Sequence, residues 1–169
     1  LGDVYKRQVA AWSHQPVDDQ SSDAFASATL AYQRDFDFDF VKVTPASSYC
    51  LTDWGATTYW TGNPHGTRDY GKALVQTVDE WSKLKVLDPH AGQMGEIVRG
   101  LELIGQGLEK DTPFIQTVFS PMTQARNLVG AHELLLHIRL HPDVIKDAFQ
   151  IITDQTISFI EAARETGIS

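Results

Sequence analysis

The order of apolar and polar positions along the chain predicts strands that alternate with helices. Short β-rich runs occupy Val9–Trp12, Phe38–Thr44 and Phe114–Phe119, and each run is followed by polar or proline-containing turns. Such bounded apolar runs are typical of buried strands. Strands that are separated by helices imply parallel pairing with right-handed crossovers. The pattern therefore predicts an α/β protein.

Helices are predicted where apolar side chains recur three and four residues apart, because such residues share one helix face. Proline in a first turn and glycine after a last turn mark the helix ends. The predicted helical stretches run from Ser21 to about Arg34, from Leu74 through Trp81 to a stop at Asp88-Pro89, from Ile97 to Leu108, from Met122 to Val129, from His132 to Leu140, and from Pro142 to the residues before Gly167.

A long, aromatic and turn-rich segment, Ala46–Gly71, is predicted to be a loop. A loop of this length in a compact domain is usually functional. Its aromatic side chains either line a pocket for a flat ligand or form a small satellite core that fixes the loop. The sequence leaves both alternatives open for Tyr49, Trp54, Tyr59 and Trp60.

Composition narrows the class of protein. The 169 residues are 42% hydrophobic and 21% charged, which excludes wholesale disorder. The single Cys50 excludes an internal disulfide framework and a cysteine-rich zinc site, and it favours a reducing, cytoplasmic location. No apolar run is long enough for a transmembrane helix. The net charge of −8, with scattered basic residues, argues against a nucleic-acid partner.

The first eight residues, Leu1–Gln8, lack an initiating Met and the basic and apolar regions of a signal peptide. The codons CTC GGA GAT GTG TAT AAG AGA CAG encode these residues, and that string resembles a common transposase-end sequencing adapter. We therefore expect residues 1–8 to be a translated adapter artefact. The domain would then comprise residues 9–169, and the true N-terminus would be missing.

Several motifs resemble the uroporphyrinogen decarboxylase family. Pro113–Thr123 resembles the family's third-strand motif, in which the strand ends in a Gly-Ala-Pro-Trp-Thr-like turn. His141-Pro142-Asp143, with a long helix ending in Glu165-Thr166-Gly167, resembles the family's His-Pro-Glu helix and the Ala-Gly-Ala-Asp that follows it. Asp37–Pro45 together with Asp53-Trp54-Gly55 resembles a variant common in the decarboxylase-like and methyltransferase-like branches.

The resemblance implies an α/β fold that is an incomplete (β/α)₈ TIM barrel. It runs from Val9 to Ser169 in the family's order, whereas such barrels typically need about 250 residues. The chain would then hold about strands 1–3 with their helices and would be truncated before strand 4. A self-contained, non-catalytic α/β binding module is the alternative from a different class.

Active sites of barrel enzymes lie at the carboxyl ends of the strands. Three stretches occupy that place in the predicted order: Ser13–Gln15, Pro45–Asp53 and Ser120–Met122. His14 there would be a pocket acid, base or donor, or else a solvated loop histidine. The candidate pocket residues are His14, Gln15, Asp18, Tyr49, Asp53, Ser120 and Met122.

The resemblance also implies two reactions. Decarboxylases of the family act on tetrapyrrole acetate side chains in porphyrin and haem biosynthesis without a cofactor. They carry a Met-Arg-Gln-Ala-Gly-Arg motif after strand one, of which only Gln15 is retained, because His14 and Asp18 stand where the arginines would be. Their essential aspartate lies just past strand two, but this chain has no acidic residue between Asp39 and Asp53.

The alternative within the same superfamily is a corrinoid-linked zinc methyltransferase. It would use zinc and a corrinoid methyl donor, with His and Cys zinc ligands outside this chain, so no metal is expected on these residues. The small-molecule partner would be a tetrapyrrole or a methyl donor, and the resemblance allows a homodimer of the full-length parent. We expect the fragment alone to be inactive in either case.

Lys42, two pairs of histidines and Cys50 also need an interpretation. Lys42, within the predicted second strand, either forms a structural pair or takes part in catalysis, because a buried lysine needs a partner or a lowered pKa. His132 and His137 are five residues apart rather than the four that a zinc-protease helix requires. We expect His137 and His141 to be exposed helix-end residues and Cys50 to be a small packing residue.

Overall fold

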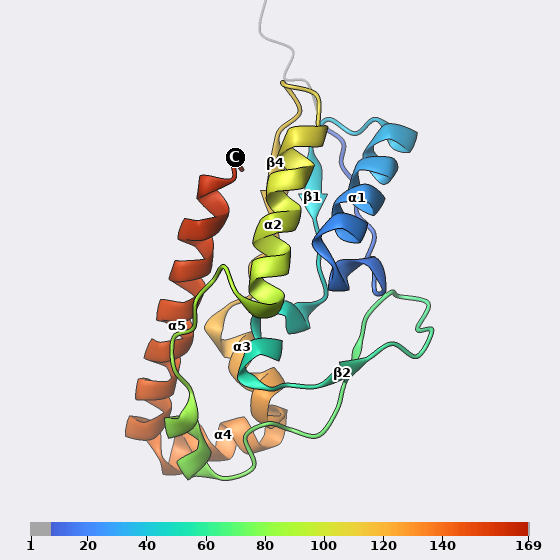
Figure 1. The fold of residues 1–169 in the computed structure, drawn as a ribbon. Coiled ribbons are helices and arrows are strands. Elements are labelled where there is room, and N and C mark those ends of the chain that lie inside the picture. The colour runs from blue at the N-terminus through green and yellow to red at the C-terminus, as the bar shows by residue number, and fades with distance from the viewer. Residues whose placement is uncertain (1–7, 169) are drawn as a thin grey trace, which may run out of the picture.

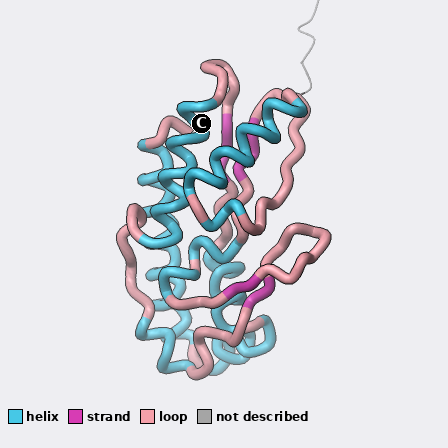
Figure 2. The backbone as a smooth tube through the Cα atoms, turned by 45° about the vertical axis from the view of Figure 1, so that its right-hand side comes forward, coloured by secondary structure: helices cyan, strands magenta, loops and turns pink. Residues whose placement is uncertain are grey.

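The computed structural model describes residues 8–168 (Figure 1). The expected adapter segment, residues 1–8, lies outside the described residues except for Gln8. Long helices lie alongside a short parallel sheet, and a smaller antiparallel ribbon lies apart from it (Figures 1 and 2). The helices are α1 (Ser22–Phe36), α2 (Gly92–Gly107), α3 (Pro121–Val129), α4 (Ala131–Leu140) and α5 (Pro142–Glu165), and the strands are β1 (Val41–Val43), β2 (Thr58–Tyr59), β3 (Asp69–Tyr70) and β4 (Phe114–Gln116).

Strands β1 and β4 pair in parallel, as the alternation of strands and helices predicts. Val41 lies opposite Phe114, and Val43 lies opposite Gln116. The β-branched side chains of Val41 and Val43 are 6% and 0% exposed and belong to the main core. Both strands are shorter than the apolar runs that predicted them.

The first predicted strand, Val9–Trp12, is absent from the described structure. The segment runs beside β1 (Figure 1), but its backbone bonds there are confined to its start, where Asp39 N–H donates to the Val9 carbonyl at 3.0 Å. The Val9 amide donates to Asp39 Oδ2 at 2.7 Å. Val9 and Trp12 are 62% and 53% exposed. The prediction of three strands is therefore wrong at this segment, because an apolar run does not by itself secure a pairing partner.

Helix α1 packs along α2 at positions where α2 carries glycine. A Cβ at Gly107 would approach Leu30 Cδ1 to 2.4 Å, and a Cβ at Gly100 would approach Phe25 Cδ1 to 3.3 Å. Phe25 is 1% exposed at this contact. The two glycines allow the helices to approach closely, which places α1 beside the sheet and α2 across it (Figure 1).

The predicted break at Gly130 is confirmed, because α3 ends and α4 begins on either side of it. The predicted helix start at Pro142 is confirmed as the start of α5. Gly130 has φ +95°, a conformation that favours glycine. The apolar stripe of α5 is buried against the rest of the core, with Ile145, Ile152 and Phe159 each at most 3% exposed. The sequence signals of these helices are strong because spacing, proline and glycine agree.

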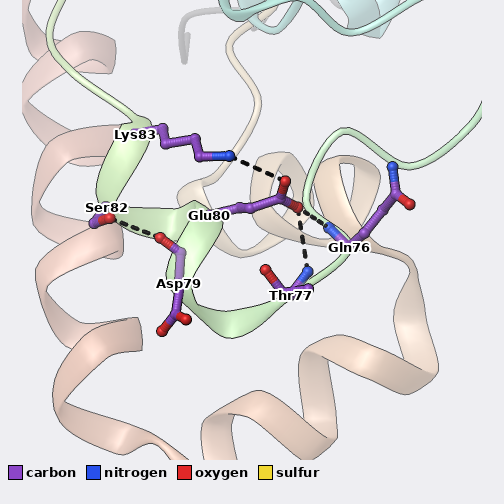
Figure 3. Close-up of polar contacts among 6 residues, drawn as sticks. All are labelled: Gln76, Thr77, Asp79, Glu80, Ser82 and Lys83. Carbon is purple, nitrogen blue, oxygen red and sulfur yellow. Dashed lines mark hydrogen bonds and ion pairs between the residues drawn. The ribbon is translucent and has the colours of Figure 1, made fainter.

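The predicted helix at Leu74–Trp81 is instead a 3₁₀ turn at Val78–Lys83. A capping box defines its start, because Glu80 Oε2 accepts hydrogen bonds from the backbone N–H of Gln76 at 2.7 Å and of Thr77 at 3.2 Å (Figure 3). The bond from Gln76, then those from Lys83 and Thr77, lower the pKa of Glu80. The i, i+4, i+7 spacing that predicted a longer helix begins at Leu74, whereas the cap at Thr77 starts the helical turn three residues later.

Trp81 anchors that turn to α4. Its ring is 1% exposed, and its Nε1–H donates to His137 Nδ1 at 3.0 Å. His137 is half-buried, so the expectation that it is exposed is wrong, whereas His141 is exposed as expected. A buried indole N–H needs an acceptor, and α4 supplies one.

We predict that His137→Leu destabilises the protein by about 1–3 kcal/mol, because it leaves the Trp81 N–H buried without a partner. The loss should shrink in a Trp81→Phe background, where no N–H remains. Urea unfolding of the wild type, both single variants and the double variant gives the coupling energy. An equal loss in both backgrounds would contradict the hydrogen bond as the cause.

The long loop contains more structure than the sequence indicates. β2 and β3 form an antiparallel ribbon, with Thr58 opposite Tyr70, that extends to the right in Figure 1. Its aromatic residues do not gather round one pocket. Tyr49 joins the main core, Trp54 Nε1 donates to the Lys85 carbonyl at 2.8 Å, and Tyr59 is 51% exposed. Among residues 8–168, none of the helices combines the length and the hydropathy that a membrane span requires.

Candidate functional site

The carboxyl ends of β1 and β4 lie together because the strands are parallel. The chain leaves β1 into the 3₁₀ turn Ser47–Cys50 and leaves β4 toward α3. Thr117, just past β4, extends the contact with β1, because its N–H and Oγ1–H donate to the carbonyl of Val43 at 3.1 and 2.9 Å. This edge of the sheet is where a barrel enzyme would hold its substrate.

Asp19 fastens the first loop to the second. Its side chain is 2% exposed, and its Oδ2 accepts a hydrogen bond from the Ala46 N–H at 2.7 Å. Its Oδ1 accepts from Gln20 Nε2 at 2.6 Å, and its carbonyl accepts from Gln93 Nε2 at 3.0 Å. Burial raises the pKa of Asp19, and the hydrogen bonds and the nearby charge of Arg68 oppose that rise. The sequence singled out the neighbouring Asp18 instead, which is half-buried.

The raised pKa of Asp19 gives a pH-dependent prediction. The unfolded chain releases this proton near the ordinary value of 3.8, whereas the folded chain holds it to higher pH. The wild type should therefore lose stability relative to Asp19→Asn as pH rises from below 3.8 through the raised pKa. Unfolding free energies measured across this range test the sign.

Asp18→Asn is the matched control, since it removes the same charge one residue away. A difference between wild type and Asp19→Asn that grows in the wild type's favour as pH rises would contradict the assignment. Thermal unfolding monitored by circular dichroism gives the same comparison independently of denaturant.

His14, Gln15 and Asp18 lie in one loop, as the sequence predicts. His14 is half-buried, and its Nδ1 is buried without a hydrogen-bond partner among the described residues. The long loop covers it, because a Cβ at Gly66 would approach His14 Cβ to 2.7 Å. Arg68 holds this cover in place by donating to the Pro16 carbonyl and, at 3.1 Å, to Thr58 Oγ1.

Asp53 binds the start of α2 rather than facing a cavity. Its Oδ1 accepts from the Gln93 N–H at 2.7 Å, and its Oδ2 accepts from the Met94 N–H at 2.9 Å. The helix's own preceding residue, Ala91, supplies no side-chain cap. Gly92 has φ +59°, and a Cβ there would lie 2.1 Å from Asp53 Oδ1. The carboxylate therefore acts as a long-range cap that complements the positive end of the helix dipole.

We predict that Asp53→Ala costs about 1–2 kcal/mol in unfolding free energy, because two backbone N–H groups at the start of α2 lose their acceptor. Asp53→Asn should cost less, since it keeps one acceptor oxygen. Urea unfolding measures both, with the exposed Asp111→Ala as a control for loss of charge. A cost for Asp53→Ala no greater than that of the control would contradict the capping role.

Tyr49 links the loops after β1 and β4. Its side chain is 3% exposed, its hydroxyl donates to the Thr117 carbonyl at 3.2 Å, and its ring packs against Phe159 at 5.0 Å between centroids. Burial raises the pKa of Tyr49 well above its ordinary value. Burial likewise raises the pKa of Cys50 to about 12, so its thiol is protonated at neutral pH. The burial of Cys50 agrees with its expected role as a packing residue.

Ser120 and Met122 begin α3. Ser120 Oγ accepts from the Thr123 N–H at 3.3 Å as an N-cap, and Pro121 takes the first helical position. Met122 is 51% exposed and borders a groove of about 400 Å³ that α4 and α5 also line. Both residues therefore have local structural explanations.

The structure brings the candidates to one end of the sheet but not into one cavity. Gln15, Tyr49 and Met122 line three separate cavities. Sequence reasoning missed Asp19 and Arg68, which connect the loops. The position of Asp19 next to the candidate Asp18 was a weak sequence signal. Arg68 is a single arginine in a polar loop and gave no signal. Among residues 8–168, no group of three or more His, Cys, Asp or Glu could hold a metal ion.

The parallel pairing of β1 with β4 and the helices packed beside it define an α/β domain, and comparison with known proteins assigns its family. The sequence model described as uroporphyrinogen decarboxylase (URO-D) matches residues 6–169. The chain belongs to the uroporphyrinogen decarboxylase family, whose superfamily includes both decarboxylases and methyltransferases. The match begins within the segment expected to be an adapter. No curated protein matches the chain.

Among solved structures, a methyltransferase from Methanosarcina mazei is similar in fold, with a TM-score of 0.79 at 16% sequence identity. The similarity covers 93% of this chain and 46% of that chain. The chain therefore spans about half the length of the solved structure that it matches. At this identity the match establishes the fold alone, and it supports the α/β barrel-type class predicted from the sequence.

Proposed function

We propose that the chain is the N-terminal half of a barrel enzyme of the uroporphyrinogen decarboxylase family, and that the enzyme transfers a methyl group in corrinoid metabolism. The observation that carries this choice is the position of Asp53. Both of its oxygens bind the α2 backbone, so the first acidic residue after β1 is engaged in the scaffold. A decarboxylase of the family would need a free carboxylate near this place.

The loop that contains His14 and Asp18 supports the same choice. Decarboxylases of the family bind a substrate with many carboxylates through two arginines in this loop, and a carboxylate in their place repels such a substrate. Asp18 and the buried Asp19 leave the loop acidic, and the guanidinium of Arg68 is engaged with the Pro16 carbonyl and Thr58. This arrangement suits a small substrate better than a polycarboxylate macrocycle.

The residues of this chain do not fit a zinc ion on their own. The described part of the chain holds no cluster of potential ligands, and the Cys50 thiol is protonated and buried. Zinc, which in this branch activates a thiol, would be bound by His and Cys residues outside this chain. The residues described here would shape the pocket: Asp19, Tyr49 and Asp53 position its loops.

The decarboxylase remains the second candidate, because the matching family model is described as uroporphyrinogen decarboxylase. The deciding experiment extends the reading frame on both sides of the chain and expresses the longer protein. We expect bound zinc and methyl transfer from methylcobalamin to a thiol. Conversion of uroporphyrinogen to coproporphyrinogen in a protein without zinc would overturn the proposal.

Asp53→Asn sharpens that test in the longer protein. Because Asp53 caps α2, the variant should unfold at lower urea concentration yet keep its turnover per folded molecule. Loss of turnover in a fully folded variant would instead identify Asp53 as a catalytic residue and favour decarboxylation.

A non-catalytic binding module makes a different prediction about residues 9–169. The outer edge of β4 borders an apolar groove of about 320 Å³, shared with α5 and lined in part by Ile115, Val118 and Ile160. Unpaired strand edges promote association, so we expect these residues alone to aggregate. A cooperative thermal transition of a monomer would favour the module.

A further inference from the structure

Lys42 places a positive charge on the face of the sheet opposite the main core. It lies in the middle of β1 between Val41 and Val43, whose side chains are buried. Successive side chains of a strand point to opposite faces, so Lys42 points away from the core side. Its register partner on β4, Ile115, shares this second face and is 40% exposed.

The Lys42 ammonium group contacts an aromatic ring instead of an acid. Its Nζ lies 3.7 Å from the centroid of the Trp12 ring, which is a cation–π distance. Trp12 itself is 53% exposed. Within residues 8–168, the ion pairs and side-chain hydrogen bonds do not include Lys42 Nζ; the ion pairs join Arg34 to Asp35, Lys83 to Glu80 and Arg99 to Glu102.

We propose that Lys42 and Trp12 form an anion-binding site on this face, and that the anion is the carboxylate of a small molecule whose apolar part lies on Trp12 and Ile115. The Trp12 ring holds the ammonium group from one side and leaves its remaining N–H groups free to donate. The exposed Trp12 ring that contacts Lys42, and the exposed Ile115 that lies opposite Lys42 in the register, supply apolar surface for the rest of the ligand.

The charge of the site favours a carboxylate over a phosphate. One ammonium group neutralises one negative charge, whereas phosphate sites generally add backbone N–H groups at a helix N-terminus. At α2, two such N–H groups, those of Gln93 and Met94, already bind Asp53. The protein as a whole carries a net charge of −8, so an organic anion needs a local positive charge such as Lys42 to bind.

In a closed barrel this face of the sheet would point inward, so the placement of the site in the enzyme interior rests on the proposed function. Binding itself does not depend on turnover or on the identity of the reaction. Absence of methyl transfer in the longer protein would therefore not count against the carboxylate site. Absence of carboxylate binding would not count against the proposed reaction.

The test uses the longer protein with its lysines reductively methylated with ¹³C-formaldehyde, a change that keeps the positive charge. The Lys42 resonance is assigned by its absence in Lys42→Arg. The ring current of Trp12 should change the chemical shift of the Lys42 resonance. Trp12→Leu should return that chemical shift to the range of the exposed Lys72 and Lys110. That comparison establishes the contact with Trp12 in solution.

Sodium propionate is then titrated in, with sodium chloride at matched ionic strength as the control. We expect a saturable shift of the Lys42 resonance with a Kd on the order of millimolar, absent for Lys72 and Lys110 and weakened in Trp12→Leu. A Lys42 shift that follows sodium chloride equally, or that matches the exposed lysines, overturns the proposal.

Thermal unfolding supplies a second readout. Propionate should raise the Tm of the wild type but not of Lys42→Met, because a ligand stabilises only the form that binds it. If Lys42→Met does not fold, the resonance titration of the wild type decides alone. In the longer protein, a Lys42 resonance that propionate does not move would show that a carboxylate of the chain occupies the site, which also overturns the proposal.

Discussion

The parallel pairing of β1 with β4 is the constraint on which the rest of the structure depends. It joins segments about seventy residues apart along the chain, in a register that opposes Val41 to Phe114. Parallel strands cannot be joined by a tight turn, so the intervening chain must form α2 and the long loop. The same pairing brings the loops that contain Tyr49 and Thr117 to one end of the sheet, where the hydroxyl of Tyr49 binds the Thr117 carbonyl.

The loops at that end are held by two carboxylates, the buried Asp19 and the half-buried Asp53. Asp19 binds the Ala46 backbone, and Asp53 binds the first N–H groups of α2. Each carboxylate meets backbone donors from a distant part of the chain, so each one fixes a loop at a point that the strands do not reach. Of the candidate polar side chains, Tyr49, Asp53 and Ser120 bind the backbone and so serve the scaffold.

The sequence predicted the helices best where several signals agreed, as at Gly130 and Pro142. It failed at Val9–Trp12, because an apolar run shows that a segment is suited to a strand but not whether a neighbour pairs with it. It failed at Leu74–Trp81, because the spacing of three apolar residues outweighed a capping box that starts at Thr77. The candidate site was predicted by position alone. That Asp53 would meet a helix forty residues further on is a tertiary fact that local spacing does not encode.

The commitment of Asp53 to α2 also constrains how such a domain could change its chemistry. A descendant that needed a free carboxylate at this place would first have to give α2 another cap, since freeing Asp53 alone would weaken the helix before any new reaction gained from it. A new acid elsewhere in the loop would be useful only after its surroundings had been rebuilt. Each of the two changes is unfavourable without the other, so evolution should retain the present arrangement. Related domains that keep Gly92 should therefore also keep an acid that caps α2 beside it.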